Sequence, residues 1–183
     1  MLHPWKDINT FGYSFAGSLL GQTWANLYWL SILILKNPQL RGCFELGTWN
    51  GALSTFFGLY FPGFMITADK LDQRNRHTQE LHCRLGVKFI QADCHKLAEL
   101  VSVLESLLRP ALLFCDGGDK ELEFQLLCPL LQEGDIVGVH DVGTEFQIER
   151  PEILACIREH HLSPLDTVEN HIDETRSMYW RRD

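Results

Sequence analysis

The stretch that decides the fold is residues 43–54, which read Cys-Phe-Glu-Leu-Gly-Thr-Trp-Asn-Gly-Ala-Leu-Ser. An apolar run, a turn with two glycines and a second apolar run predict a buried strand that leads directly into a helix. Gly47 and Gly51 give the turn backbone freedom and let a ligand approach the peptide groups closely. Ligands of open α/β sheets bind beyond the carboxyl ends of the strands. We therefore expect this turn to be the floor of a ligand site, with Glu45 pointing an acceptor into the crevice.

The spacing of the two glycines argues against a dinucleotide as the ligand. A dinucleotide-binding turn has the pattern G-x-G-x-x-G, and its middle glycine lets a pyrophosphate touch the backbone. That position is Trp49 in this chain, and a bulky indole disfavours the contact. An oxidoreductase with a nucleotide cofactor is thus a weaker alternative, and a strand-to-helix turn with no ligand is another.

Strand and helix patterns alternate along the rest of the chain, as in a doubly wound α/β protein with a mostly parallel sheet. Helical patterns cover residues 19–35, 51–60, 73–85, 96–108, 121–131 and 151–161. Strand patterns cover residues 42–46, 64–69, 87–93, 111–115, 135–139, 162–168 and 177–181.

Acidic residues stand at the ends of the expected strands. Asp69 follows the second strand, where a carboxylate can accept hydrogen bonds from both hydroxyls of a ribose, although an aspartate there is also a common turn former. Asp93 ends the third strand, where capping of the next helix is the alternative. Asp116 and Asp141 follow the fourth and fifth strands, and two acids at neighbouring strand tips suit a hard cation such as Mg²⁺.

In this order, the motifs resemble those of class I S-adenosylmethionine-dependent methyltransferases. The pattern E-x-G-x-x-x-G from Glu45 to Gly51 is similar to motif I of that class. The later Asp116-Gly117 and His140-Asp141 resemble the small-molecule O-methyltransferase branch with catechol, macrolide-sugar and cephalosporin-type enzymes. The resemblance covers about residues 42–142.

The resemblance implies a Rossmann-like methyltransferase fold. This fold has a doubly wound, mostly parallel seven-stranded sheet, helices on both faces and a C-terminal antiparallel hairpin. Residues 1–183 would form a single domain, with an N-terminal aromatic segment and helix in residues 1–41 and the cofactor-binding core in residues 42–183. The aromatic segment is either a lid over the site or a flank that packs its rings on the domain.

The resemblance also assigns residues to the site. The cofactor-binding residues would be Glu45, Gly47, Thr48, Trp49, Asn50, Gly51, Ser54, Asp69, Lys70, Asp93, Cys94, Asp116 and Gly117. Metal ligands would be Asp116, His140 and Asp141, and the catalytic residues would be His140 and Asp141.

Two departures from the family pattern leave metal dependence open. Many relatives have a histidine where Asp119 stands and a second carboxylate where His140 stands. His140 is therefore a metal ligand, a general base or a hydrogen-bonded histidine at a strand end. Asp119 and Lys120 are candidates for proton transfer in an exposed loop, with a helix N-cap as the alternative for Asp119.

The composition limits the kinds of molecule that the protein is expected to bind. A formal net charge of −8 gives no electrostatic basis for binding nucleic acid. The sequence shows no signal-peptide pattern and no apolar run long enough for a membrane span, and its six cysteines form no C-x-x-C pair. We expect a cytoplasmic protein with reduced thiols, and a homo-oligomer if the aromatic segment covers a neighbouring subunit's site.

The function expected on these grounds is methyl transfer from S-adenosylmethionine to a hydroxyl, or less favourably an amine, of a small-molecule acceptor. Mg²⁺ is a candidate second cofactor. A non-catalytic protein on the same fold, which binds the cofactor or acts through partners, is the main alternative.

Overall fold

The computed structural model describes residues 14–93, 96–165 and 176–183. The strands of its main sheet are β3 (Gly42–Leu46), β4 (Met65–Asp69), β5 (Lys88–Gln91), β6 (Ala111–Cys115), β7 (Ile136–Val139), β8 (Leu162–Pro164) and β9 (Met178–Arg182). The helices are α1 (Trp24–Lys36), α2 (Ala52–Tyr60), α3 (Arg76–Leu85), α4 (Leu97–Glu105), α5 (Lys120–Leu127) and α6 (Pro151–Glu159), with a 3-10 turn η1 (Cys128–Leu130) after α5.

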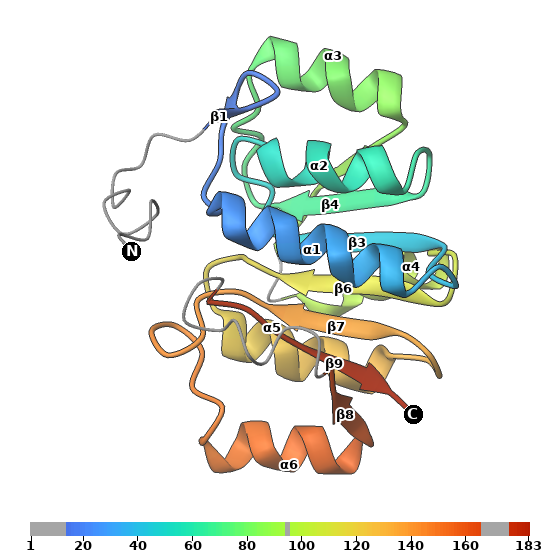
Figure 1. Ribbon diagram of the computed structural model, residues 1–183, viewed down its shortest axis with the longest axis vertical. Helices are drawn as coiled ribbons and strands as arrows, with labels where there is room; N and C mark the ends of the chain where they lie inside the picture. Colours follow the sequence, from blue (N-terminus) through green and yellow to red (C-terminus); the bar gives the residue numbers. More distant parts are fainter. Residues whose placement is uncertain (1–13, 94–95, 166–175) are drawn as a thin grey trace, which may run out of the picture.

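The seven strands of the sheet have the order β5-β4-β3-β6-β7-β9-β8 (Figure 1). The first five strands in this order, β5 to β7, pair with one another in parallel, and β9 runs antiparallel to both β7 and β8. This arrangement confirms the predicted mostly parallel sheet and its C-terminal antiparallel hairpin. The carboxyl ends of β3, β4, β6 and β7 therefore lie along one edge, where ligands of such sheets bind.

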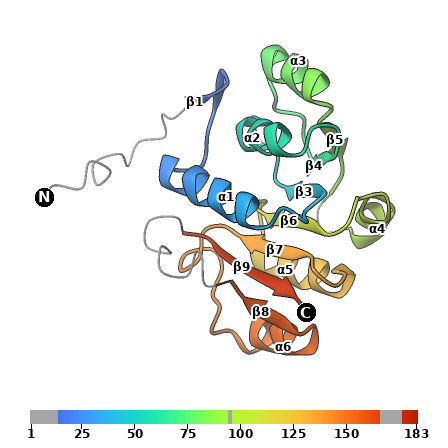
Figure 2. The same ribbon diagram turned by 45° about the vertical axis from the view of Figure 1, so that its right-hand side comes forward.

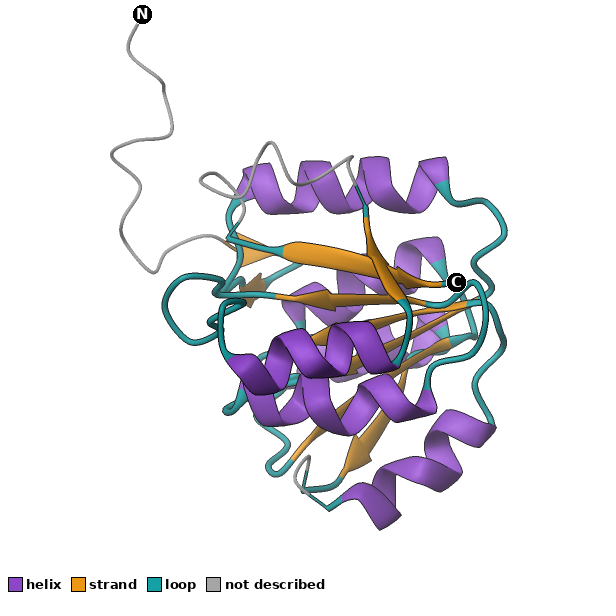
Figure 3. Ribbon diagram, turned by 90° about the horizontal axis from the view of Figure 1, so that it is seen from below, coloured by secondary structure: helices purple, strands orange, loops and turns teal. Residues whose placement is uncertain are grey.

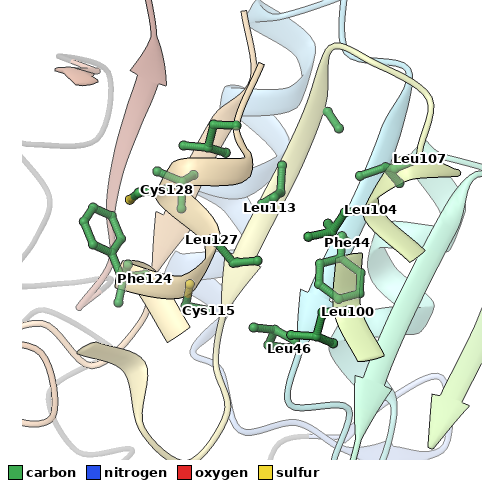
Figure 4. Close-up of a cluster of buried hydrophobic side chains, with 14 of the residues drawn as sticks. Phe44, Leu46, Leu100, Leu104, Leu107, Leu113, Cys115, Phe124, Leu127 and Cys128 are labelled. Atoms are coloured by element: carbon green, nitrogen blue, oxygen red, sulfur yellow. The ribbon is translucent and has the colours of Figure 1, made fainter. Parts of the chain in front are cut away.

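Helices cover both faces of the sheet (Figures 2 and 3). Alternate residues of the central strands face opposite sides: Cys43 and Leu112 join the core beneath α1 and α2, whereas Phe44 and Leu113 join the core beneath α4, α5 and α6. Figure 4 shows the second core, in which side chains of β3 and β6 meet those of α4 and α5. Burial on both faces explains why these strands read as unbroken apolar runs.

The first helix begins later than the sequence predicts. Ser14–Phe15 (β1) and Ser18–Leu19 (β2) form a two-stranded hairpin, and Thr23 caps α1 by accepting a hydrogen bond from the amide of Asn26. The ring of Phe15 packs edge-on against Trp24 and Phe56, which is the flank-packing alternative for this residue. The other aromatic residues of the N-terminal segment lie outside the described residues.

Two other predicted segments differ in length. The helix expected at residues 121–131 is interrupted, because Pro129 has no amide hydrogen to continue it and the chain turns into η1. The strand expected at residues 162–168 is described only through β8, since residues 166–175 are not described. Within the described ranges, no helix is both long and apolar enough to cross a membrane.

Candidate functional site

The turn after β3 is shaped by left-handed backbone at Gly47 (φ 93°) and Trp49 (φ 44°). The amide of Gly47 donates to the carbonyl of Ala68 at 2.9 Å, so the turn stays attached to β4. A Cβ atom at Gly47 would collide with the carbonyl oxygen of Asp116 at the end of β6. The absent side chain therefore lets the tips of β3 and β6 lie in contact. The close approach of a ligand, which the sequence predicted for this glycine, stays a prediction.

The tip of β4 lies against the same turn. Oδ2 of Asp69 accepts a hydrogen bond of 2.8 Å from the amide of Trp49, and Oδ1 accepts one of 3.3 Å from the amide of Leu71. Nζ of Lys70 lies 3.4 Å from Oδ1 of Asp93, beyond the end of β5. Asp69, Lys70 and Asp93 thus form one polar group beside the turn.

Asp93 and Cys94 are the predicted contacts of the adenine, and capping of the next helix is the alternative for Asp93. The residue at the N-cap position of α4 is Lys96, and the carbonyl of Asp93 accepts the Lys96 amide at 2.9 Å. Asp93 is therefore not the N-cap residue of α4. Cys94, the other predicted adenine contact, lies outside the described residues.

Glu45 does not point into the crevice, which corrects the expectation from the sequence. Its side chain is fully buried beneath α2, where Oε2 accepts hydrogen bonds from Ser54 and from Thr67. Burial raises the pKa of Glu45 to about 8, and these two hydrogen bonds oppose the shift only in part. Glu45 and Ser54 consequently link β3 to α2, and neither is among the residues that line the cavity described below.

Gly51 and Gly117 shape the chain around the site. Gly51 is the N-cap residue of α2 with φ 78°, and a Cβ atom there would meet Thr78 and His82. Gly117 follows Asp116, and its amide donates to Oε2 of Glu123 at 3.1 Å. Asn50 lies between Trp49 and Gly51 in the turn and is partly buried.

A cavity of about 230 Å³ opens at this edge of the sheet. Five of its lining residues belong to the predicted site: Gly47, Thr48, Trp49, Asp116 and Asp141. The others come from the segment before α1, from α2 and from α5: Leu19, Gly21, Gln22, Ala52, Leu53 and Lys120. The turn after β3 and the acids after β6 and β7 therefore face one common space.

Asp116, His140 and Asp141 lie together, as the metal hypothesis requires, with one potential ligand atom of each within 4.8 Å of the others. Nδ1 of His140 lies 3.2 Å from Oδ1 of Asp116 and 3.3 Å from Oδ2 of Asp141. Burial alone would lower the pKa of His140, but the two carboxylates outweigh it and raise the pKa to about 9. The imidazole is therefore protonated at neutral pH, which argues against its predicted role as general base.

Lys120 is buried, not exposed as the sequence suggested, and only 4% of its side-chain surface is accessible. Its Nζ lies 2.6 Å from Oε2 of Glu145 and 3.3 Å from Oδ2 of Asp141, and it donates to the carbonyl of Gly117 at 2.9 Å. Burial opposes the charge, but these carboxylates still raise the pKa of Lys120. Lys120 is therefore a fixed ammonium in the wall of the cavity.

Asp119 has the structural role that was the alternative in the sequence. It is the N-cap residue of α5, and its Oδ1 accepts a hydrogen bond of 3.0 Å from the amide of Leu122. Since the cap fixes the first turn of α5, it also fixes the direction of Lys120, the first residue of that helix.

The acids at the two strand tips fit a divalent cation poorly in this arrangement. Asp141 faces Lys120, His140 and Arg176, and these cations lower its pKa against the opposing effect of burial. Asp116 faces His140 and also accepts a hydrogen bond of 2.5 Å from Nε2 of Gln22. A metal ion at these oxygens would lie close to the positive charges of Lys120 and Arg176, which repel it.

Four residues of the site were missed or misplaced by sequence reasoning: Gln22, Lys120, Glu145 and Arg176. The position of Lys120 could have been inferred from the sequence. Lys120 follows Asp116 by four residues and comes directly after the capping residue Asp119, which places it at the start of a helix close to Asp116. The contacts of Gln22 and Arg176 join segments far apart in the chain and leave no local pattern.

No protein-family model and no curated protein sequence matches this chain. Solved structures match its fold. The structure cmcI-N160 with SAH has a TM-score of 0.70 and 16% identity, and the match covers 95% of this chain and 84% of that one. A Staphylococcus aureus protein assigned as a caffeoyl-CoA O-methyltransferase has a TM-score of 0.61 and 14% identity, with 87% of this chain and 84% of that one covered.

A third match is MycE, a methyltransferase of the mycinamycin biosynthetic pathway, in complex with Mg, SAH and mycinamycin VI. Its TM-score is 0.58 at 16% identity, and the match covers 87% of this chain but 50% of MycE. At these identities the likeness concerns the fold. This chain therefore has the Rossmann-like methyltransferase fold that its sequence motifs predicted.

Proposed function

We propose that this chain transfers a methyl group from S-adenosylmethionine to a hydroxyl oxygen of a small-molecule acceptor. The observation that carries the proposal is the cavity at the carboxyl edge of the sheet, because the Gly47–Trp49 turn lines it on one side and Asp116, Lys120 and Asp141 line it on another. Structures of the same fold contain SAH, the demethylated form of that cofactor. The motif order in the sequence supports the same cofactor independently of the fold.

The residues around the turn after β3 fit a cofactor that carries an amino acid and a nucleoside but no phosphate. Gly47, Thr48 and Trp49 line the cavity, and Trp49 stands at the position where a pyrophosphate would need a glycine. Asp69, partly exposed at the tip of β4, is the acceptor that we assign to the ribose. Lys70 and Asp93 are assigned to the adenine side.

When bound, S-adenosylmethionine supplies a methyl group on a positively charged sulfur, which keeps the electron pair of the broken carbon–sulfur bond. The chain has to align the acceptor oxygen with that methyl carbon, exclude water and remove one proton. We assign alignment to Asp116, Lys120 and Asp141, whose polar groups face the cavity.

Proton removal is assigned to Glu145. His140 and Lys120 carry protons at neutral pH, and the pKa of Asp141 is held below its usual range, so none of these groups is a good base. The Lys120 ammonium stabilises negative charge on the acceptor oxygen as the new bond to carbon forms. Glu145 is not among the residues that line the cavity, so it receives the proton through Lys120, which lies 2.6 Å away, passes one proton to Glu145 and takes up the hydroxyl proton. The side chain of Glu145 is 57% exposed and releases the proton to solvent.

Three further expectations are kept as proposals. Residues 42–183 make up the cofactor-binding core, with residues 1–41 as its N-terminal segment. The formal net charge of −8 favours a small acceptor over nucleic acid, and the protein acts in the cytoplasm. An amine acceptor is the less favoured alternative to a hydroxyl.

The test is calorimetric titration of the purified chain with S-adenosylmethionine, S-adenosylhomocysteine and, as a control, NAD. We expect saturable binding of the first two at one site and no binding of NAD. A screen of phenols and sugars as acceptors, read by formation of S-adenosylhomocysteine, follows. Absence of binding would refute the methyltransferase proposal, whereas binding without turnover of any acceptor would favour the non-catalytic alternative.

A further inference from the structure

We propose that the Lys120 ammonium takes the place of a divalent cation beside Asp116 and Asp141, so that this site works without a metal. The catalytic role given to Lys120 rests on the proposed methyl transfer. Its structural content, an internal cation that excludes Mg²⁺, can be tested without any methyl acceptor.

The carboxylate of Asp141 is fully engaged by protein cations. Its Oδ2 lies 3.3 Å from Nζ of Lys120 and 3.3 Å from Nδ1 of His140. Its Oδ1 lies 2.7 Å from a terminal guanidinium nitrogen of Arg176. A Mg²⁺ ion bound to either oxygen, at the roughly 2.0–2.1 Å that this ion demands, would lie close to the Lys120 ammonium or the Arg176 guanidinium, whose positive charges repel it.

The carboxylate of Asp116 is engaged in the same way from the other side. Its Oδ1 lies 3.2 Å from Nδ1 of His140 and 4.0 Å from Nζ of Lys120. Its Oδ2 accepts the hydrogen bond from Gln22, whose own carbonyl accepts one from the side chain of Asn26. Gln22 is thus held in place, and its hydrogen bond occupies one lone pair of the second oxygen of Asp116.

Lys120 is built into this position. The ammonium is bound by the carbonyl of Gly117 and by Glu145 as well as by Asp141, so three acceptors surround its three hydrogens. With 4% of its side-chain surface accessible, it cannot turn out into solvent without breaking all of these contacts. A mobile surface lysine would leave room for a metal ion, whereas this one does not.

The charges and ligand types agree with the geometry. Asp116, Asp141 and Glu145 bring three negative charges, and Lys120 and Arg176 already bring two positive ones. A divalent cation would therefore leave an excess of positive charge in a largely buried site. The third residue of the group is His140, and Mg²⁺ prefers oxygen to imidazole nitrogen.

The consequence for the reaction is that alignment and charge stabilisation come from a side chain. An ammonium in the cavity wall attracts the developing negative charge on an acceptor oxygen through its positive charge, as a metal ion would, but it offers no open coordination position. The site therefore suits an acceptor that offers one hydroxyl, because a pair of adjacent hydroxyls would have no metal to chelate.

The experiment is titration of the intact chain with Mn²⁺, followed by electron paramagnetic resonance of the free ion, for the wild type, Lys120→Met and the control Lys36→Met. Lys36 is an exposed lysine in the last turn of α1, so its loss changes the net charge equally without touching the site. We expect no saturable binding by the wild type or by Lys36→Met. Lys120→Met, which keeps the aliphatic stem and uncovers the carboxylates, should bind one Mn²⁺ at least about tenfold more tightly.

Stoichiometric Mn²⁺ binding by the wild type that is lost in Asp141→Asn would overturn the proposal. The absence of a gain in Lys120→Met, or in Lys120→Gln should the first variant fail to fold, would overturn it as well. Titration of the same samples with S-adenosylmethionine separates the two proposals. Loss of the methyltransferase assignment would show as absent cofactor binding, whatever the outcome with Mn²⁺.

Discussion

The backbone amide of Trp49 donates a hydrogen bond of 2.8 Å to Oδ2 of Asp69, which ties the turn after β3 to the tip of β4. The bond holds the left-handed backbone of Trp49 against the neighbouring strand. It also fixes the orientation of the carboxylate that we assign to the cofactor ribose. One contact thus serves the shape of the turn and the placement of a binding group.

Asp69→Ala should weaken binding of S-adenosylmethionine, because it removes both the acceptor for the ribose and the anchor of the Trp49 amide. A loss of about 1.5–3 kcal/mol, the cost of removing hydrogen bonds to a charged group, corresponds to roughly 10–150-fold in affinity. Calorimetric titration measures it. Asp69→Asn keeps one oxygen for the Trp49 amide and should lose less. Equal affinity in Asp69→Ala and the wild type would show that Asp69 has no part in the site.

Gly47→Ala should destabilise the protein far more than Gly63→Ala. Both glycines have left-handed backbone, at φ 93° and φ 80°, so an alanine at either one costs about 1–2 kcal/mol of strain. A Cβ atom at Gly63 meets nothing within 4 Å, whereas one at Gly47 collides with the carbonyl of Asp116. Urea unfolding of both variants measures their losses of unfolding free energy, and the difference between the two losses is the cost of the collision at Gly47. Equal losses of unfolding free energy would show that β3 and β6 can separate at their tips without cost.

Glu45→Gln should become more stable relative to the wild type as the pH rises. The folded pKa of Glu45 is raised from 4.5 to about 8, so the folded state holds a proton that the unfolded state releases between these values. Wild-type stability therefore falls over this interval, by at most about 1.4 kcal/mol per pH unit from this group. Glutamine is neutral throughout and removes the slope.

Urea unfolding of Glu45→Gln and the wild type at pH 5, 6, 7 and 8 measures the difference. Glu80→Gln is the control, since Glu80 is an exposed glutamate on α3 whose ion-pair partner within the described part of the chain is Arg76 on the same helix. A constant difference between Glu45→Gln and the wild type across these pH values would contradict the raised pKa of Glu45.

The sequence predicted those parts of the fold that depend on local signals. The apolar run 111–115 is β6 with the same bounds, because a strand buried on both faces needs every residue apolar. The helical pattern predicted for residues 73–85 has the C-terminal end of α3, which Gly86 terminates with left-handed backbone. The predicted order of strand, glycine turn and helix around Gly47 is also confirmed, because β3 leads through this turn into α2.

The direction of buried polar side chains could not be predicted. In a strand covered on both faces, alternation is hidden, so nothing in the pattern tells whether Glu45 faces the ligand edge or the underside of α2. Lys120 read as a loop residue because its partner Glu145 lies 25 residues further along the chain. Gln22, 94 residues from Asp116, is another contact that only the tertiary structure creates.

His140→Gln should lose stability relative to the wild type at low pH and approach it at high pH. The carboxylates of Asp116 and Asp141 outweigh burial and raise the folded pKa of His140 from 6.5 to about 9. The stability contributed by the charged imidazole is therefore fully present below about pH 6.5 and is lost as the pH rises through about 9. Urea unfolding of both proteins between pH 6 and pH 10 measures this difference. Because glutamine can still donate a hydrogen bond to the carboxylates but never carries charge, a pH-independent difference would show that His140 is neutral and leave it available as a general base.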